Sequence, residues 1–129
     1  MPLQQNYLGN SVYDRQAVQG IFTGALTATG SSQGTALALP SDFCLFTTVS
    51  SSTGCILPGS VDSTATPGPA AIGDTVIIVN HGAQTLSVYP QGTGKVANGS
   101  ASAAFSVAAT KTAEFLYIGS SNWAASVSA

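Results

Sequence analysis

The sequence predicts an all-β fold: a single β-sandwich or barrel-like domain (jelly-roll or tulip-like) over residues 19–129, preceded by an extended N-terminal arm over residues 1–18. Three observations predict it. Short runs rich in Val, Ile, Thr and aromatic residues recur along the chain, and clusters of Gly, Pro, Ser and Asn separate them. Gly and β-branched residues are too frequent for long helices. At 129 residues the chain is long enough to bury one core.

The first half of the chain is expected to hold four strands, at Gly20–Ala28, Thr35–Leu39, Phe43–Val49 and Cys55–Leu57. Cys44 and Cys55 flank the turn at residues 50–54, where a disulfide would staple a hairpin. Nothing in the sequence indicates an oxidising compartment, so we expect two reduced, half-buried thiols. Across that turn Cys55 would pair opposite Thr48 or Val49.

Between the halves, Pro58–Ala71 contains three prolines, two glycines and several Ser or Thr residues, a composition typical of a long loop. Neither half holds enough large apolar residues for a core of its own. We therefore expect an exposed crossover between two sheets and not a linker between domains.

The second half predicts a β-meander of strands at Asp74–Asn80, Thr85–Tyr89, Ala103–Val107, Ala113–Ile118 and Trp123–Val127. The first of these is nearly all apolar, as in a central strand covered on both faces. His81–Gln84 would form the turn that follows, with Gly82 at positive φ. Asn98-Gly99 is a common turn dipeptide, and Trp123 is expected to close the core.

Charged residues make up 6% of the chain, against about 25% in an average soluble domain. Since charge keeps free copies of a protein apart, this scarcity indicates a polar but uncharged surface, much of which faces other protein. Arg15, Lys95 and Lys111 lie far apart in sequence, so no basic patch for nucleic acid is expected. No apolar stretch is long enough for a transmembrane helix.

The sequence does not predict an enzyme, a cofactor or a metal site. His81 could form a catalytic triad with Asp74 and a serine, but no sequence motif for a nucleophilic serine supports this. We expect a solvent-exposed histidine in a turn. Gly92–Lys95 lacks the full phosphate-loop pattern and the helix after it. Two thiols and one distant histidine are too few ligands for zinc. Three aromatic residues of the second half could form a sugar platform: Tyr89, Tyr117 and Trp123. We favour the alternative in which Trp123 and Phe115 lie in the core and the two tyrosines lie at its rim.

Residues 1–18 are polar, with two tyrosines and little periodicity; only Val12–Val18 allows a helical turn. They form either a disordered terminus or an arm that orders on a neighbouring subunit, with tyrosines supplying contact area. The candidate interface residues are Tyr7, Tyr13, Arg15 and Val18. The N-terminus lacks the basic and apolar regions of a secretory signal. We therefore expect a protein used in the cytoplasm, or one that leaves the cell by lysis or within a larger particle.

The run Gly73-Asp74-Thr75-Val76-Ile77-Ile78-Val79-Asn80-His81-Gly82-Ala83-Gln84-Thr85-Leu86-Ser87-Val88-Tyr89-Pro90 resembles a pattern in small virion structural proteins of tailed bacteriophages. Asn98-Gly99, Phe105, Ala113-Glu114-Phe115, Trp123 and the upstream Gly54–Pro58 continue it, so the resemblance covers roughly residues 20–125. Cys55 departs from the pattern, where an aliphatic or polar residue is expected. The family includes head decoration, cement and fibre-associated proteins.

The resemblance implies a β-rich domain displayed in many copies, with no catalytic residues to carry over. We expect a non-enzymatic decoration or cement protein, made in the host cytoplasm, on the outer surface of a capsid. Its partners would be the major capsid protein and, as a dimer or trimer, its own copies. The alternative is a fibre-tip or receptor-binding domain whose loops, Pro58–Ala71 and Gln91–Asn98, touch a host-surface glycan. A secreted adhesin or carbohydrate-binding module is disfavoured by the lack of a signal pattern.

Overall fold

A computed structural model describes residues 22–59 and 69–129, and within those ranges every regular element is a β-strand, which confirms the all-β prediction. The strands there correspond one for one to those expected from the sequence. They are β1 (Phe22–Thr27), β2 (Leu37–Ala38), β3 (Phe43–Thr48), β4 (Gly54–Ile56), β5 (Thr75–Asn80), β6 (Leu86–Tyr89), β7 (Phe105–Val107), β8 (Thr112–Gly119) and β9 (Asn122–Val127).

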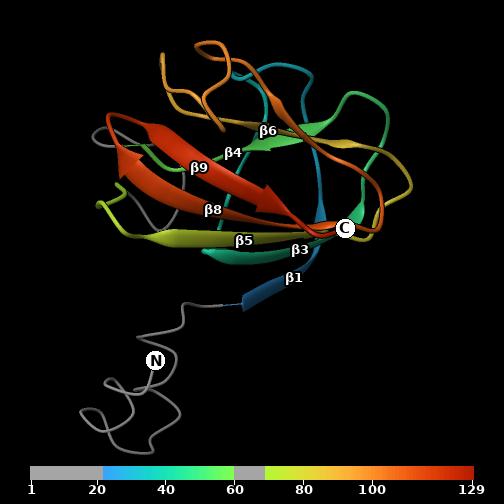
Figure 1. Cartoon of the computed structure of the whole chain (residues 1–129). Helices are drawn as coiled ribbons and strands as arrows, with labels where there is room; N and C mark the ends of the chain where they lie inside the picture. Colours follow the sequence, from blue (N-terminus) through green and yellow to red (C-terminus); the bar gives the residue numbers. More distant parts are fainter. Residues whose placement is uncertain (1–21, 60–68) are drawn as a thin grey trace, which may run out of the picture.

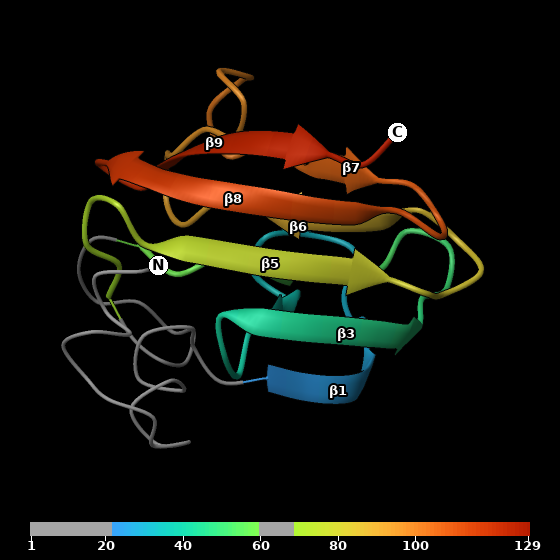
Figure 2. The ribbon, with the colours of Figure 1, turned by 60° about the horizontal axis from the view of Figure 1, so that its bottom comes forward.

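These strands form two sheets that lie one over the other (Figure 1). One sheet has five strands in the order β1-β3-β5-β8-β9, and Figure 2 shows them side by side in that order. The other has four strands in the order β2-β4-β6-β7. From β1 to β6 the chain alternates between the sheets, each odd-numbered strand in the first and each even-numbered strand in the second. It therefore winds around the core.

The winding makes the first six strands pair in parallel with one another within each sheet. The pairs β1–β3, β3–β5, β2–β4 and β4–β6 are parallel, whereas β5–β8, β6–β7 and β8–β9 are antiparallel. The prediction of a β-meander in the second half is wrong, because β5 and β6 belong to different sheets, as do β7 and β8. Jelly rolls are built from antiparallel strands, so the four parallel ladders do not support the jelly-roll form of the prediction.

The link from β5 to β6 is thus a crossover between sheets and not the predicted hairpin turn. Gly82 in this link does not have the positive φ expected of it. A Cβ at Gly82 would instead lie 2.6 Å from the Cβ of Val49, in the link that follows β3. Real Cβ atoms do not come that close, so glycine is needed here because two crossovers pass each other.

Asn80, the last residue of β5, fastens this crossover to the rest of the fold. Its side chain is fully buried. The Nδ2 group donates hydrogen bonds of 2.9 Å to the carbonyl oxygens of Gln84 and Val107, and Oδ1 accepts one of 2.9 Å from the Gly82 N–H. One side chain therefore joins β5, the crossover and the end of β7.

The core lies between the two sheets and draws on both halves of the chain. Its fully buried large side chains include Phe46 and Leu57 from the first half and Phe115 and Trp123 from the second. Trp123 is 1% exposed, which confirms its predicted place in the core. The segment expected as a crossover does connect β4 of one sheet to β5 of the other, although most of it lies outside the described residues.

Cys44 and Cys55 are free and buried, which confirms the expected thiols, although neither is exposed to any extent. The expected pairing of Cys55 across a β3–β4 hairpin is wrong, because these strands lie in different sheets; Cys55 pairs with Leu37 and Val88. Burial raises the pKa of both thiols, and that of Cys55 rises well above its usual value of 9.0.

Two tight turns have two successive non-glycine residues at positive φ, the pattern of a type I′ turn. Ser120 and Ser121 (54° and 61°) connect β8 to β9. The other turn places Ala97 and Asn98 (53° and 56°) at its centre, and the Gly99 N–H closes it on the Val96 carbonyl at 3.0 Å. The predicted Asn98-Gly99 turn is therefore displaced by one residue.

Candidate functional site

The candidate site is the outer side of the five-stranded sheet, which faces away from the core. Side chains alternate across a strand, so the partly exposed positions between buried ones point outward, as in β5 and β8. Many of these outward side chains are large and apolar, and we call them the outer patch. It consists of Phe22, Phe43, Leu45, Ile77, Val79, Leu116 and Ile118.

Strand register lines up the aromatic part of the outer patch. Phe22, Phe43 and Ile77 are direct neighbours across β1, β3 and β5. The two phenyl rings meet edge to face, with centroids 5.0 Å apart and planes at 80°. A Cβ at Gly24 would lie 3.0 Å from the Phe22 ring, so glycine leaves the space over β1 that this ring occupies.

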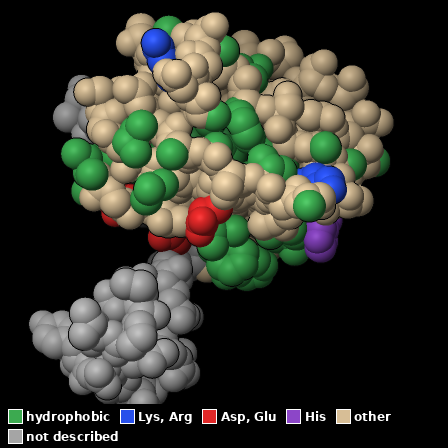
Figure 3. Space-filling model, in the orientation of Figure 1, with side chains coloured by type: hydrophobic (Ala, Val, Ile, Leu, Met, Phe, Trp, Pro, Cys, Tyr) green, Lys and Arg blue, Asp and Glu red, His purple; other side chains and the backbone are tan. Residues whose placement is uncertain are grey.

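The outer patch is unusually open to solvent for side chains of this kind. Phe22 and Ile118 are each 54% exposed and Leu116 is 43% exposed. Scattered apolar residues are normal on a protein surface, whereas a contiguous group on one sheet face marks a site of interaction. Figure 3 shows hydrophobic side chains gathered at the lower edge of the described part of the molecule.

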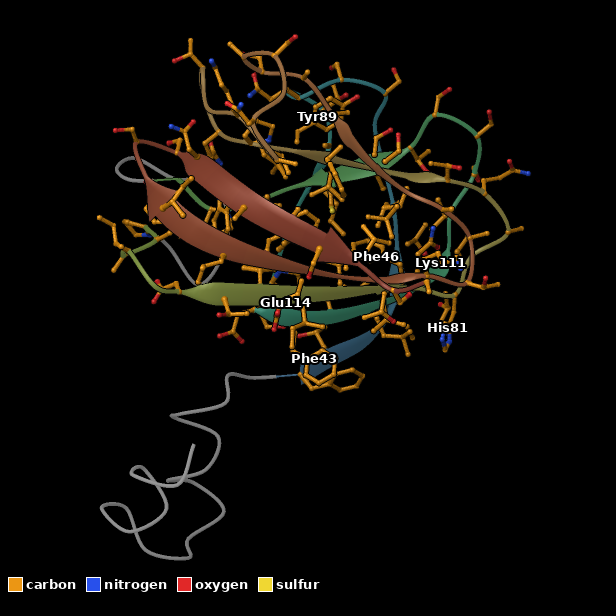
Figure 4. All side chains as sticks on the ribbon, in the orientation of Figure 1. Phe43, Phe46, His81, Tyr89, Lys111 and Glu114 are labelled. Carbon is orange, nitrogen blue, oxygen red and sulfur yellow. The ribbon has the colours of Figure 1, made fainter. Side chains whose placement is uncertain are left out.

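Acidic groups lie at one end and in the middle of the outer patch. Asp42 and Asp74 directly precede β3 and β5, and these strands are parallel, so both acids lie at the same edge of the sheet. Glu114 is exposed and stands opposite Ile77 in the register. Figure 4 shows Glu114 on the same side of the sheet as Phe43, and Figure 3 shows acidic side chains beside the hydrophobic group.

Basic groups lie at the opposite end. His81 directly follows β5, and Lys111 directly precedes β8, which runs antiparallel to β5. The Asn80 N–H donates a 2.9 Å hydrogen bond to the Lys111 carbonyl, which brings the two segments together. Figure 4 shows His81 and Lys111 together at one end of the sheet. Lys111 stands opposite Asn80, whose side chain is buried towards the core, so strand alternation does not place the lysine on the outer face.

The residues expected to form an interface from the sequence, Tyr7, Tyr13, Arg15 and Val18, lie outside the described residues, as does Val12–Val18. The structure does not test whether residues 1–18 form an arm. The first described residue, Phe22, belongs to the outer patch.

The aromatic residues considered for a sugar platform do not gather on one surface. Tyr117 and Trp123 are 2% and 1% exposed and pack against each other with ring centroids 4.9 Å apart. Tyr89 lies in β6 of the other sheet, and its hydroxyl donates a hydrogen bond to the Ser31 carbonyl. The Trp123 Nε1 group is buried and has no hydrogen-bond partner among the described residues. The core position expected for Trp123 is confirmed, whereas Tyr117, expected at the rim of the core, is buried within it.

The titratable groups of the described residues are dispersed. Asp74 and His81 lie at opposite ends of β5, so the structure does not bring together the pair considered for a triad. His81 is exposed, as expected of a solvated histidine, although in a crossover. No group of three His, Cys, Asp or Glu residues that could hold a metal ion occurs in ranges 22–59 and 69–129. Among the same residues no helix is long and apolar enough to span a membrane.

No protein-family model matches the chain, and searches of curated proteins and of solved structures return no match.

Sequence reasoning missed the outer patch, although the sequence holds a signal for it. In β8 the buried Phe115 and Tyr117 alternate with Leu116 and Ile118, so both faces of the strand are apolar. A strand with two apolar faces at the surface of a small domain indicates a second contact. The apolar run of β5 predicts a strand covered on both faces, whereas Ile77 and Val79 are partly exposed.

Proposed function

We propose that this chain is a non-enzymatic structural protein of a virus particle, which binds the outer surface of a tailed-phage capsid as a decoration or cement protein. In this proposal the two sheets form a sandwich-type domain over residues 19–129, and residues 1–18 form an arm that reaches the major capsid protein. The protein is made in the host cytoplasm, resides on the virion and associates with its own copies. It needs no cofactor, nucleic acid or membrane.

One observation carries the proposal: a chain with 6% charged residues presents an apolar sheet face, with Phe22, Leu116 and Ile118 about half exposed. A free protein in a crowded solution relies on surface charge to stay apart from its copies. In an assembled particle, by contrast, the surface of a capsid component is packed against other protein. Burying an unpaired charge there costs free energy. The resemblance of residues 73–90 to virion structural proteins points the same way.

The place where the arm joins the fold is also consistent with this proposal. Phe22 is the first residue of β1, which is the edge strand of the five-stranded sheet. Its phenyl ring packs against Phe43 and is part of the outer patch. An arm that starts at an exposed apolar surface extends the contact area available to a neighbouring subunit. Many weak contacts of this kind, repeated over a shell, add binding free energy to the assembled capsid.

The test is binding to empty heads assembled from the major capsid protein of the same virus. Purified full-length chain is mixed with heads, and the copies bound per head are measured after sedimentation. We expect saturable binding in hundreds of copies, and a large loss of occupancy for the triple variant Tyr7→Ala, Tyr13→Ala, Arg15→Ala. The matched control is Ser106→Ala, an exposed position of β7 in the other sheet.

Absence of binding to heads would refute the decoration proposal. Binding that is unaffected by the triple variant would refute the role of the arm while leaving decoration intact. The alternative function, glycan recognition by a fibre-tip domain, predicts a different result: binding to host-surface glycans that survives removal of residues 1–18, with only a few to tens of copies per particle.

A further inference from the structure

We propose that residues 1–21 fold back over the outer patch of the same copy, with the guanidinium of Arg15 paired with the carboxylate of Glu114. The segment then acts as a cover that keeps the apolar patch from water in the free chain. The inference goes beyond the proposed function, because the cover forms whether or not the chain binds a capsid. On a capsid, transfer of the segment to a neighbouring protein would uncover the patch, and this consequence alone rests on the proposed function.

One row of outward side chains runs across the sheet from the first described residue to Glu114. Phe22, Phe43 and Ile77 are direct neighbours across β1, β3 and β5. Glu114 stands opposite Ile77 in β8, at an exposed position between buried ones. Figure 4 shows Glu114 and Phe43 on the same side of the sheet. Residues 1–21 therefore join the fold at one end of this row, and an exposed carboxylate stands three strands away.

The segment is long enough for the proposed contact. Neighbouring strands lie about 4.8 Å apart, so the row from β1 to β8 spans roughly 14 Å. A second layer lies about 10 Å above a sheet, which lengthens the path to roughly 18 Å. Arg15 precedes Phe22 by seven residues, and an extended chain of that length spans up to roughly 23 Å. Arg15 therefore reaches Glu114, and the residues between pass over the apolar row.

Charge complementarity points to the same occupant. Asp42 and Asp74 lie at the edge where β3 and β5 begin, and β1 is parallel to β3, so Phe22 begins at that edge too. Glu114 adds a third acid in the middle of the patch. Arg15 is the only arginine of the chain, and a guanidinium matches a carboxylate in shape as well as in charge. The segment therefore brings positive charge to the acidic part of this face.

The covalent link to the patch favours the same copy over a separate partner. A short flexible tether gives a segment an effective concentration in the millimolar range, far above that of a second copy in dilute solution. The segment also supplies apolar and aromatic side chains to pack on the patch: Leu3, Tyr7, Leu8, Val12, Tyr13, Val18 and Ile21. These contacts provide most of the binding, while the exposed ion pair fixes the position of the segment.

The first test is a zero-length cross-link in the full-length chain. Arg15→Lys keeps the positive charge and introduces an amine, which a carbodiimide joins to a carboxylate only where the two are in contact. We expect mass spectrometry of the monomer fraction to find position 15 joined to Glu114. The matched control adds Glu114→Gln, which removes the carboxylate at nearly constant size, and this cross-link should then be lost.

A charge exchange tests the cover independently, with the uncharged dye Nile red as a probe of exposed apolar surface. Arg15→Glu and Glu114→Arg, each alone, place like charges together and leave the patch uncovered for more of the time. Each should lower the apparent dissociation constant of the dye about three-fold. The combined variant restores opposite charges and should return the constant to that of the unaltered chain. Lys95→Glu makes the same charge change as Arg15→Glu at an exposed position outside the outer patch and should have no effect.

A further variant identifies where the dye binds. Leu116→Thr with Ile118→Thr removes half-exposed apolar surface from the patch. Added to Arg15→Glu, these changes should cancel the gain in dye binding. Circular dichroism checks that each variant is folded.

A cross-link found only in dimers would overturn the inference, since it would assign the cover to a neighbouring copy. Failure of the Arg15→Lys chain to join Glu114 would do the same. So would a dye dissociation constant that neither charge reversal lowers, or that the combined variant does not restore. None of these measurements uses capsids, so the inference and the proposed function can fail separately.

Discussion

Asn80 makes the most specific prediction about what holds this fold together. It is a fully buried polar side chain whose three hydrogen bonds reach the β5–β6 crossover twice and the end of β7 once. Asn80→Ala removes all three bonds while leaving the backbone bonds of this residue, to Lys111 and Thr110, untouched. The variant therefore measures what the side chain contributes.

The expected loss follows from the groups left behind. The hydrogen bonds to the Val107 carbonyl and from the Gly82 N–H are buried, so these two groups would have no water to replace the lost partner. An unsatisfied buried polar group costs about 1–3 kcal/mol. The Gln84 carbonyl is only partly buried and can bind water. With the small cavity added, we expect Asn80→Ala to lower the free energy of unfolding by about 3–5 kcal/mol, a large share of the roughly 5–15 kcal/mol typical of a domain.

The measurement is urea-induced unfolding, with the midpoint and the slope fitted separately. Gln84→Ala is the control, because only the backbone of that residue takes part and its side chain is exposed; its effect should stay within about 0.5 kcal/mol. Asn80→Asp separates bonding from volume, since it is nearly isosteric but lacks both donors and adds a buried charge. A loss below about 1 kcal/mol for Asn80→Ala, or an Asn80→Asp variant as stable as the unaltered chain, would refute the reasoning.

Three further predictions use the same unfolding measurement. Ala97→Gly should stabilise the fold by about 1 kcal/mol because it relieves a positive φ, whereas Ala103→Gly, at ordinary φ, should destabilise it slightly. Gly94→Ala should destabilise it by several kcal/mol, since the new Cβ would lie 1.9 Å from a backbone oxygen of the β8–β9 turn; near-normal stability would contradict this close approach. Above the ordinary thiol pKa of 9.0, stability should fall by about 1.4 kcal/mol per pH unit per thiol, because Cys44 and Cys55 ionise readily only when unfolded. The two thiols contribute fully to the free energy of unfolding below that pKa, and this contribution is lost as the pH rises towards their pKa values in the folded state. The prediction is contradicted if the double variant Cys44→Ala, Cys55→Ala loses stability with rising pH as steeply as the unaltered chain.

The sequence located the strands well, because alternation and turn residues are local properties. Thr85–Tyr89 alternates, and the structure buries Leu86 and Val88 as that pattern predicts. In the same way Trp123 and Phe115 were placed in the core. These inferences needed only the period of a strand and the size of the side chains.

The sequence could not identify which strands pair. A short polar link such as His81–Gln84 fits a hairpin and a crossover between sheets equally well, and nothing local distinguishes them. The decisive contact is between Gly82 and Val49, which are far apart in sequence. The same limit explains the error at Cys55, whose neighbours Leu37 and Val88 come from β2 and β6.

Part of the candidate site could be predicted from the sequence. Leu116 and Ile118 lie in a strand with two apolar faces, which the sequence displays directly. The position of Asp42 and Asp74 at one end of the patch could not be predicted from the sequence, because it depends on β3 and β5 being parallel. Tyr7 and the other arm residues remain predictions.

The winding of the chain also has a consequence for synthesis on the ribosome. Because β1 to β6 alternate between the sheets, no strand in the first part can close a ladder with the strand just made. The central strand β5 gains its second neighbour only when β8 appears, and β8 together with β9 brings in Phe115 and Trp123. The β8–β9 hairpin is local, so its formation costs the least chain entropy. The parallel pairs form only after long loops have closed, at a larger entropic cost. We therefore expect the nascent chain to stay open until its last strands emerge, and to fold from its C-terminal end backwards.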